Sequence, residues 1–280
     1  MKNTNRNDYM KRIVTIQDIS CVGKCSLTVA LPIISAMGIE TSIIPTAVLS
    51  THTVFNNFTF KDLTDQIEPI SNHWKEEKFN FDAIYTGYLG SKEQVNVISK
   101  FFDDFKSESN FIFVDPAMAD NGKLYPSFND EFVEEMKKLC SKADIISPNL
   151  TEAAMLTGRE YKTEYDYEYI KEIAKELYNI CGGKIIITGI ELDGKYGNLC
   201  FDGDKFNYFT HERANRVFHG TGDVFSSVCV GALAKGKSLG QAVELAGNFT
   251  FESIKATLNN PDARYYGVDF ESVLYKLTNI

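Results

Sequence analysis

The sequence predicts an α/β fold in which helices cover both faces of a mostly parallel sheet. Short apolar strands alternate with helices along most of the 280 residues. The chain opens with a strand–helix–strand unit over residues 12–45, and strands joined in this way normally pair in parallel. Several predicted strands end in a polar residue, as expected where ligands bind at the carboxyl ends of parallel strands.

The first half of the chain predicts four strands, each followed by a helix. The strands are expected at residues 12–18, 39–45, 82–86 and 111–115, and the helices at residues 25–37, 62–78, 91–106 and 130–141. Pro69 is expected to break or kink the second helix, because proline lacks the N–H that a helix interior uses. Ser91 and Gln94 have the spacing of a capping box at the start of the third helix.

The second half continues this alternation and then changes. Strands are expected at residues 143–147 and 184–188, and helices at residues 150–157 and 166–181. Gly203 and Asp204 mark a turn between residues 197–202 and 205–210, which predicts a β-hairpin. Helices at residues 224–236, 239–257 and 269–277 close the chain. Because no linker or repeat interrupts the pattern, residues 12–280 are expected to form one domain after a flexible tail at residues 1–11.

Composition and charge narrow the classes of function. The chain has a net charge of −9 and no basic run, which argues against nucleic acid as a partner. No apolar run is long enough to span a membrane, and the N-terminus lacks the apolar segment of a signal peptide. The six cysteines have neither C-x-x-C nor zinc spacing, so a reducing, cytoplasmic location is expected.

Residues 219–223, with the sequence His-Gly-Thr-Gly-Asp, form a candidate anion site. Placed before a helix, Gly220 and Gly222 would let backbone N–H groups approach an anion closely, and Gly222 is expected to need a positive φ. Asp223 would repel phosphate unless it takes a proton from an attacking hydroxyl, which suggests phosphoryl transfer from a nucleotide. A turn followed by a helix cap is the simpler alternative, and the chain contains no Walker A loop.

Oxygen-bearing side chains at two strand ends form a candidate magnesium site. Asp115 ends a buried strand, whereas Asn149 and Glu152 lie three residues apart at a helix start and share a face. Mg²⁺ prefers such oxygen ligands and usually keeps several waters. The alternatives are a capped first helix turn for Asn149 and Glu152 and a strand-end turn for Asp115.

Five motifs in series resemble those of a pyridoxal kinase of the ribokinase-like superfamily. They are Ser50-Thr51-His52-Thr53, Thr86 to Ser91, Asp115 to Asp120, Pro148 to Glu152 and Gly220 to Asp223. Each motif alone is weak, but their order and spacing match over residues 12–257. The resemblance implies a three-layer α/β/α sandwich and a homodimer. It also implies that ATP, with Mg²⁺, phosphorylates the 5′-hydroxymethyl group of a vitamin B6 vitamer.

The resemblance also implies a role for each matching residue. Asp223 would be the base, and the backbone amides of Gly220, Thr221 and Gly222 would form the anion hole. Asn149 and Glu152 would organise Mg²⁺ through water, with Asp115 and Asp120 near the metal and the ATP phosphates. The remaining roles are phosphate contact for Thr188, cover of the nucleotide for Tyr125, and lining of the vitamer pocket for Asp18, His52, Thr53 and Tyr88.

Asp18 departs from the resemblance, because pyridoxal kinases usually carry serine there. An ionised aspartate at the end of a buried strand needs a hydrogen-bond donor. That donor is expected to be either the protein itself, for example Lys24 or a loop amide, or an amino group of the substrate. The second alternative would favour amine-bearing substrates such as pyridoxamine and the thiamine pyrimidine.

Three other functions compete with a pyridoxal kinase. A hydroxymethylpyrimidine kinase would have the same fold and chemistry but a different ring. A sugar kinase fits less well, because Tyr88 and Phe55 suit a flat aromatic substrate. A protein that only binds a vitamer or nucleotide would gain nothing from Asp223 as a base facing phosphate.

Overall fold

The computed structural model describes residues 10–212 and 218–280. Its strands are β1 (Arg12–Ser20), β2 (Glu40–Leu49), β3 (Phe60–Asp62), β4 (Ala83–Thr86), β5 (Phe111–Val114), β6 (Ala119–Asp120), β7 (Lys123–Leu124), β8 (Ile145–Ile146), β9 (Lys184–Leu192), β10 (Lys195–Phe201) and β11 (Phe206–His211). Its helices are α1 (Leu27–Ala36), α2 (Thr64–Glu76), α3 (Lys92–Phe105), α4 (Asp130–Cys140), α5 (Leu150–Thr157), α6 (Tyr167–Cys181), α7 (Thr221–Ala234), α8 (Leu239–Asn259) and the 3₁₀ helix η1 (Phe270–Leu277). Most of the predicted tail, residues 1–9, lies outside the described residues.

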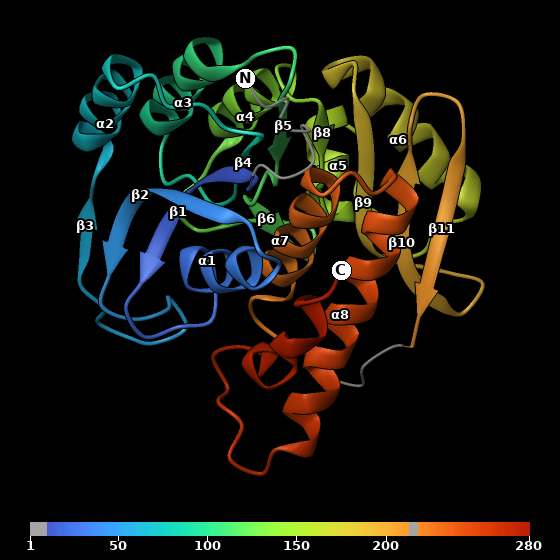
Figure 1. The fold of residues 1–280 in the computed structure, drawn as a ribbon. Helices are drawn as coiled ribbons and strands as arrows, with labels where there is room; N and C mark the ends of the chain where they lie inside the picture. The colour runs from blue at the N-terminus through green and yellow to red at the C-terminus, as the bar shows by residue number, and fades with distance from the viewer. Residues whose placement is uncertain (1–9, 213–217) are drawn as a thin grey trace, which may run out of the picture.

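Within the described residues, nine strands form one sheet in the order β11-β10-β9-β8-β5-β4-β1-β2-β3 (Figure 1). The strands from β2 to β9 in this order pair in parallel. The strands β3, β10 and β11 are antiparallel additions at the two edges. The predicted mostly parallel sheet and the predicted hairpin are therefore both confirmed.

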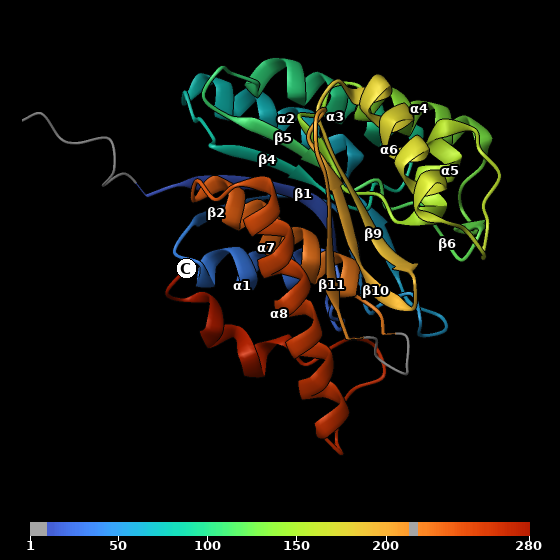
Figure 2. The same cartoon turned by 90° about the vertical axis from the view of Figure 1, so that its right-hand side faces the viewer.

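Helices cover both faces of the sheet, so the fold has the three layers that the resemblance implies. Figure 2 shows α2 to α6 on one side of the strands and α1, α7 and α8 on the other. Side chains of one strand alternate between the two cores because successive residues point to opposite faces. Val14 and Ile16 of β1 enter the core under α2–α6, whereas Ile13 enters the core under α1, α7 and α8.

Several boundaries differ from the prediction. The strands β1 and β2 run on to Ser20 and Leu49, which pair with each other. The helix α2 continues through Pro69, with Ile67 and Ser71 buried on either side of it. This packing holds the helix together although proline removes one backbone hydrogen bond. The final helix is of the 3₁₀ type, and α7 begins three residues earlier than expected.

The capping box predicted for α3 forms only in part. The Ser91 side chain accepts a hydrogen bond from the Gln94 N–H at 3.2 Å, as predicted. The Gln94 side chain does not return to Ser91. Its Oε1 accepts from the Gly90 N–H at 2.7 Å, and its Nε2 donates to the Thr46 carbonyl at 3.0 Å. Gln94 therefore ties α3 to the loops around it.

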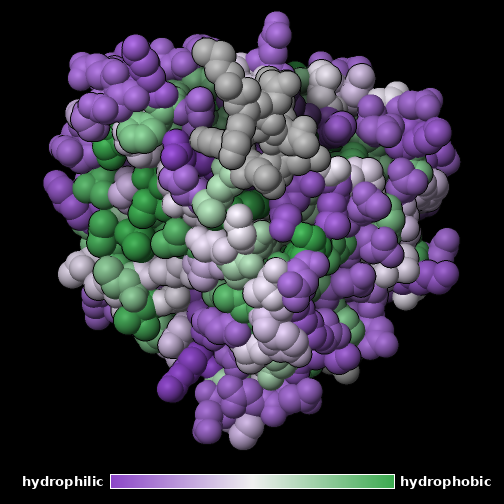
Figure 3. Space-filling model, viewed as in Figure 1, coloured by the Kyte–Doolittle hydropathy of each residue, from purple (hydrophilic) through white to green (hydrophobic). Residues whose placement is uncertain are grey.

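Apolar side chains gather on one part of the surface in Figure 3, over the edge of the sheet that β2 and β3 form. Phe60 of β3 and Val54 of the preceding loop are 51% and 36% exposed. A patch of this kind would be stabilised by contact with another surface. Among the helices of the described residues, none combines the length and apolar character needed to cross a membrane.

Candidate active site

The candidate site lies where adjacent parallel strands end. The pairing of β1 with β2 is irregular around Asp18, because the register shifts by one residue between Gln17 and Ile19. Asp115 directly follows β5. Both aspartates are largely buried, with 5% and 9% of their surfaces exposed. Asp115 thus follows the end of its strand as the sequence predicted, whereas Asp18 lies inside β1, which continues to Ser20, rather than at its end.

The helix α7 begins inside the candidate anion loop. Gly220 is its N-cap with φ of 75°, and Val224 is the first residue whose N–H bonds back, to the Gly220 carbonyl at 3.0 Å. Gly222 and Asp223 therefore lie within the first turn, where the N–H groups precede the first helical bond. The expectation of a positive φ at Gly222 was wrong, because that conformation belongs to Gly220.

The electrostatic surroundings of Asp223 suit a base. Burial, the nearby Asp115 and Asp18 raise the pKa of Asp223 to about 8, and the N–H of Ser26 acts against this by donating to the carboxylate. The side chain is half-buried, so a substrate can still reach it. A carboxyl with a pKa near the working pH can accept a proton from a hydroxyl and release it again.

Asn149 and Glu152 form the capping box that the sequence left open as an alternative. The Asn149 Oδ1 accepts from the Glu152 N–H at 3.0 Å, and Glu152 Oε2 accepts from the Asn149 N–H at 2.9 Å. The other oxygen of Glu152 accepts from the N–H of Met118 at 3.1 Å. The Asn149 Nδ2 donates to the Ala119 carbonyl at 2.8 Å. Both side chains thus hold the loop after Asp115 against α5.

The residues fit Mg²⁺ as an ion that keeps most of its waters. Ser226 donates to one carboxylate oxygen of Asp115 at 2.8 Å. Burial raises the pKa of Asp115 to about 6, and burial together with Asp115 raises that of Glu152. Neither carboxylate pairs with a lysine or arginine of the described ranges, so a cation would relieve their repulsion. Those ranges hold no group of three His, Cys, Asp or Glu side chains that could by themselves hold a metal ion.

We expect Glu152→Gln to act on both the loop and the metal. The amide NH₂ would face the N–H of Met118 or Asn149, leaving a buried donor unsatisfied, so the melting temperature should fall by a few degrees. The lost charge should raise the Mg²⁺ concentration for half-maximal rate about tenfold. Gln241→Glu, in the matching capping box of α8, is the control. An unchanged Mg²⁺ titration would leave Glu152 with a structural role alone.

Asp18 finds its donor within the protein. The hydroxyl of Ser26 hydrogen-bonds to it, although burial still raises the pKa of Asp18. Lys24, the donor considered from the sequence, instead pairs with Asp269 at 2.6 Å and Glu271 at 2.9 Å. Lys24 therefore anchors the segment before η1 rather than the carboxylate at the end of β1.

Two histidines face each other beside the anion loop. The ring of His52 lies 5.0 Å from that of His219, and its Nδ1 accepts from the Val54 N–H at 3.0 Å. Burial and His219 lower the pKa of His52, so a neutral ring would carry its proton on Nε2 and could donate from there. Thr53, predicted to line the same pocket, is exposed on the loop after β2.

Tyr88 presents an aromatic surface near Asp18. Its ring lies 5.6 Å from that of Phe128, which stacks on Phe132 at 3.8 Å. The hydroxyl of Tyr88 bonds to Ser127, while burial and the charge of Asp18 raise its pKa. This half-buried ring can receive a flat heterocycle.

The predicted nucleotide residues surround the carboxylates. Burial raises the pKa of the Tyr125 hydroxyl, and Glu152, Asp120 and Asp115 raise it further, which places Tyr125 close to all three. The side chain of Asp120 is exposed and accepts from the Asn121 N–H at 2.8 Å. Thr188 of β9 forms a bridge with Asn149, and its N–H bonds to the Pro148 carbonyl at 3.0 Å.

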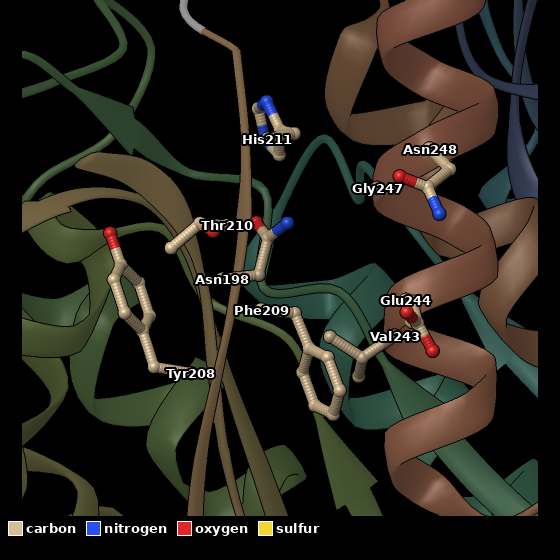
Figure 4. Close-up of a pocket in the computed structure, with 9 residues that line it drawn as sticks. All are labelled: Asn198, Tyr208, Phe209, Thr210, His211, Val243, Glu244, Gly247 and Asn248. Atoms are coloured by element: carbon tan, nitrogen blue, oxygen red, sulfur yellow. The ribbon is translucent and has the colours of Figure 1, made fainter.

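A cavity of about 200 Å³ opens between the β10–β11 hairpin and α8. Its lining residues are Asn198, Tyr208, Phe209, Thr210, His211, Val243, Glu244, Gly247 and Asn248. Figure 4 shows Phe209 and His211 on the hairpin across from Val243, Glu244 and Asn248 on the helix. The Asn198 Oδ1 accepts from the N–H of Gly189 at 3.3 Å, so one lining residue contacts β9 at the position after Thr188.

Sequence reasoning missed Ser26, Ser226 and the cavity, and it placed His219 in the anion loop without giving it a separate role. Ser226 follows Asp223 by three residues in α7, so helical spacing could have placed it on the same face. His219 precedes the glycine loop directly. Ser26 and the cavity left no local signal, because each depends on segments that are far apart in the chain.

Comparisons with known proteins point to one family. The chain matches the phosphomethylpyrimidine kinase family over residues 33–266. The hydroxymethylpyrimidine/phosphomethylpyrimidine kinase of Bacillus subtilis is 31% identical over 204 residues, 71% of each chain.

Solved structures agree with this over nearly the full length. A candidate phosphomethylpyrimidine kinase from Bacteroides thetaiotaomicron is 39% identical, with a TM-score of 0.92 over 98% of this chain and 96% of that chain. Another crystal form of it contains pyridoxal. Pyridoxal kinase from Lactobacillus plantarum is 29% identical, with a TM-score of 0.89 over 96% of this chain and 97% of that chain.

Proposed function

The chain belongs to the phosphomethylpyrimidine kinase family, and on that premise we propose that it uses ATP and Mg²⁺ to phosphorylate the 5′-hydroxymethyl group of a vitamin B6 vitamer. The observation that carries the proposal is the position of Asp223. Its carboxylate lies in the first turn of α7, beside N–H groups that can bind a phosphate and close to Asp115.

The residues divide the reaction between them. Asp223 takes the proton of the substrate hydroxyl while the hydroxyl oxygen attacks the terminal phosphorus of ATP, and ADP leaves. The N–H groups of Gly220, Thr221 and Gly222 donate to the transferred phosphoryl group. Asp115, Asn149 and Glu152 would hold Mg²⁺ through water, which would supply positive charge beside the phosphates.

The nucleotide would extend from these carboxylates toward α8. Thr188 contacts a phosphate, Tyr125 covers the chain of phosphates, and Asp120 lies at the edge. One lining residue of the cavity between the hairpin and α8 bonds to the residue after Thr188, and the cavity would offer two aromatic rings, two side-chain amides and one imidazole to an adenine base.

On the substrate side, Tyr88 and the His52–His219 pair surround a space suited to a flat ring that carries polar groups. The pyridoxal in the 39% identical structure supports a B6 vitamer as the ring. Hydroxymethylpyrimidine is the second candidate, supported by the match to the Bacillus subtilis enzyme and by an acceptor at Asp18. ATP consumption measured with each compound decides between them. If the protein consumes ATP with none of these compounds, the alternative of a protein that only binds a vitamer or nucleotide is favoured.

Asp18→Ser tests whether this carboxylate contributes to substrate selectivity. A charge-assisted hydrogen bond from an amino group is worth about 1.5–3 kcal/mol, so the substitution should cost amine-bearing substrates roughly ten- to a hundredfold in kcat/KM relative to pyridoxal. The measurement compares pyridoxal, pyridoxine, pyridoxamine and hydroxymethylpyrimidine in both proteins. If the four values keep their ratios, Asp18 makes no selective contact with the ring substituents.

A further inference from the structure

Ser26 has a backbone conformation that residues with side chains rarely adopt. Its φ is 48° and its ψ is −129°, and the residue is only 5% exposed. A conformation of this kind persists only where the surrounding structure holds it, and it is most often found at functional sites. We therefore asked which contacts Ser26 makes.

The Ser26 side chain does not cap the helix that it begins. Ser26 is the N-cap of α1, yet its hydroxyl makes no capping hydrogen bond. The hydroxyl of Thr28 secures the loop instead, donating to the carbonyls of Cys25 at 2.7 Å and Gly23 at 3.0 Å. The usual role of a serine at this position is thus unused, and the Ser26 hydroxyl is available to another partner.

The two polar groups of Ser26 bind two different carboxylates of the candidate site. Its hydroxyl lies beside the Asp18 carboxylate and its backbone N–H beside that of Asp223, and each of them lowers the pKa of the carboxyl it faces. The packing of the loop supports this placement independently. A Cβ on Gly220 would lie 2.0 Å from the carbonyl oxygen of Lys24, so the loop presses directly against the start of α7.

We propose that Ser26 is a positioning residue that fixes Asp223 through its backbone N–H and Asp18 through its hydroxyl. One residue then sets the distance between the proton acceptor and the carboxylate beside the substrate ring. The unusual backbone conformation is what lets both groups of Ser26 point into the site. The inference rests on the proposed function, in which Asp223 is the base and Asp18 lines the substrate pocket.

The variants Ser26→Gly and Ser26→Ala separate positioning from stability. Both remove the hydroxyl, but only glycine adopts this backbone conformation without strain. We expect Ser26→Gly to melt at or above the wild-type temperature and about 3–6 °C above Ser26→Ala. We also expect kcat/KM to fall about tenfold in both variants. For Ser26→Gly, KM should rise because Asp18 is released, and kcat should fall because the N–H on Asp223 is no longer held.

Ser20→Ala is the matched control. Ser20 is 1% exposed, and its hydroxyl bonds to the Cys25 thiol rather than to either carboxylate. We expect it to lower the melting temperature while leaving kcat and KM unchanged.

The outcomes distinguish this inference from the proposed function. A wild-type protein that phosphorylates neither a vitamer nor the pyrimidine would overturn the proposed function before any variant is compared. An active wild type whose Ser26→Gly variant keeps both kcat and KM would overturn the positioning role alone. If Ser26→Ala does not fold, the Ser26→Gly variant still decides the question.

Discussion

Asp223→Asn is expected to lower kcat by about 10²- to 10⁴-fold while ATP binding stays nearly intact. Asparagine has almost the same shape as aspartate, but it cannot take the proton of the attacking hydroxyl. Turnover is measured with saturating ATP and vitamer, and ATP affinity by calorimetry. Asp130→Asn, the same change in the first turn of α4, is the control. A kcat close to wild type would remove Asp223 from the chemistry.

The raised pKa of Asp223 gives this prediction a pH signature. Burial and the neighbouring carboxylates raise the pKa to about 8, so the fraction of carboxylate falls as the pH drops below that value. We expect kcat/KM of the wild type to decline about tenfold per pH unit on that side, because kcat/KM reports groups of the free enzyme. The kcat/KM of the Asp223→Asn variant should not show this decline at low pH.

The same shift predicts that Asp223→Asn stabilises the ligand-free protein. Between the ordinary pKa of 3.8 and about 8, the folded state binds more protons at this position than the unfolded state. Wild-type stability therefore falls as the pH rises through that window. We expect the variant to melt several degrees higher than wild type at pH 8 and to lose this advantage near pH 4. Equal melting temperatures at pH 8 would contradict the raised pKa.

Substitution should destabilise the protein at Gly220 but not at Gly222, the two glycines of the anion loop. An alanine Cβ at Gly220 would lie 2.0 Å from the Lys24 carbonyl oxygen, and φ there is 75°. We expect Gly220→Ala to displace the loop that carries Ser26. It should lower the melting temperature by about 5–10 °C and reduce turnover more than 10²-fold.

A Cβ at Gly222, by contrast, meets no atom within 4 Å. Gly222→Ala should therefore melt within about 2 °C of wild type. Its methyl group would occupy the space through which a phosphate approaches the backbone N–H groups, so kcat/KM for ATP should fall about 10²-fold. Normal phosphate transfer by this variant would mean that the loop serves only as a turn and helix cap.

Gly158→Ala separates strain from close contact. Gly158 also has a positive φ, 72°, but a Cβ there meets nothing within 4 Å. The variant should lose about 1–2 kcal/mol of stability from the backbone conformation alone. If Gly220→Ala loses no more stability than Gly158→Ala, the contact with the Lys24 carbonyl adds nothing to the cost of the substitution.

The sequence by itself determined the layers of the fold and the chemical character of the site. Alternating apolar segments fixed the order of strands and helices, because the periods of 2 and 3.6 residues follow from backbone geometry alone. Asp115 could be assigned to a strand end for the same reason, whereas β1 runs two residues beyond Asp18. Gly220 and Gly222 marked a candidate anion loop, because glycine lets the backbone approach a ligand closely.

Only the tertiary structure decided how these residues are used. It assigned the donor of Asp18 to Ser26 rather than Lys24, and it engaged Glu152 with backbone N–H groups of a distant loop. The positive φ belongs to Gly220 rather than to Gly222. The neighbouring Lys24 carbonyl also leaves no room for a side chain at Gly220. The contacts of Glu152 with Met118 and of Gly220 with Lys24 join segments far apart in the chain, and local sequence patterns record only the preferences of neighbouring residues.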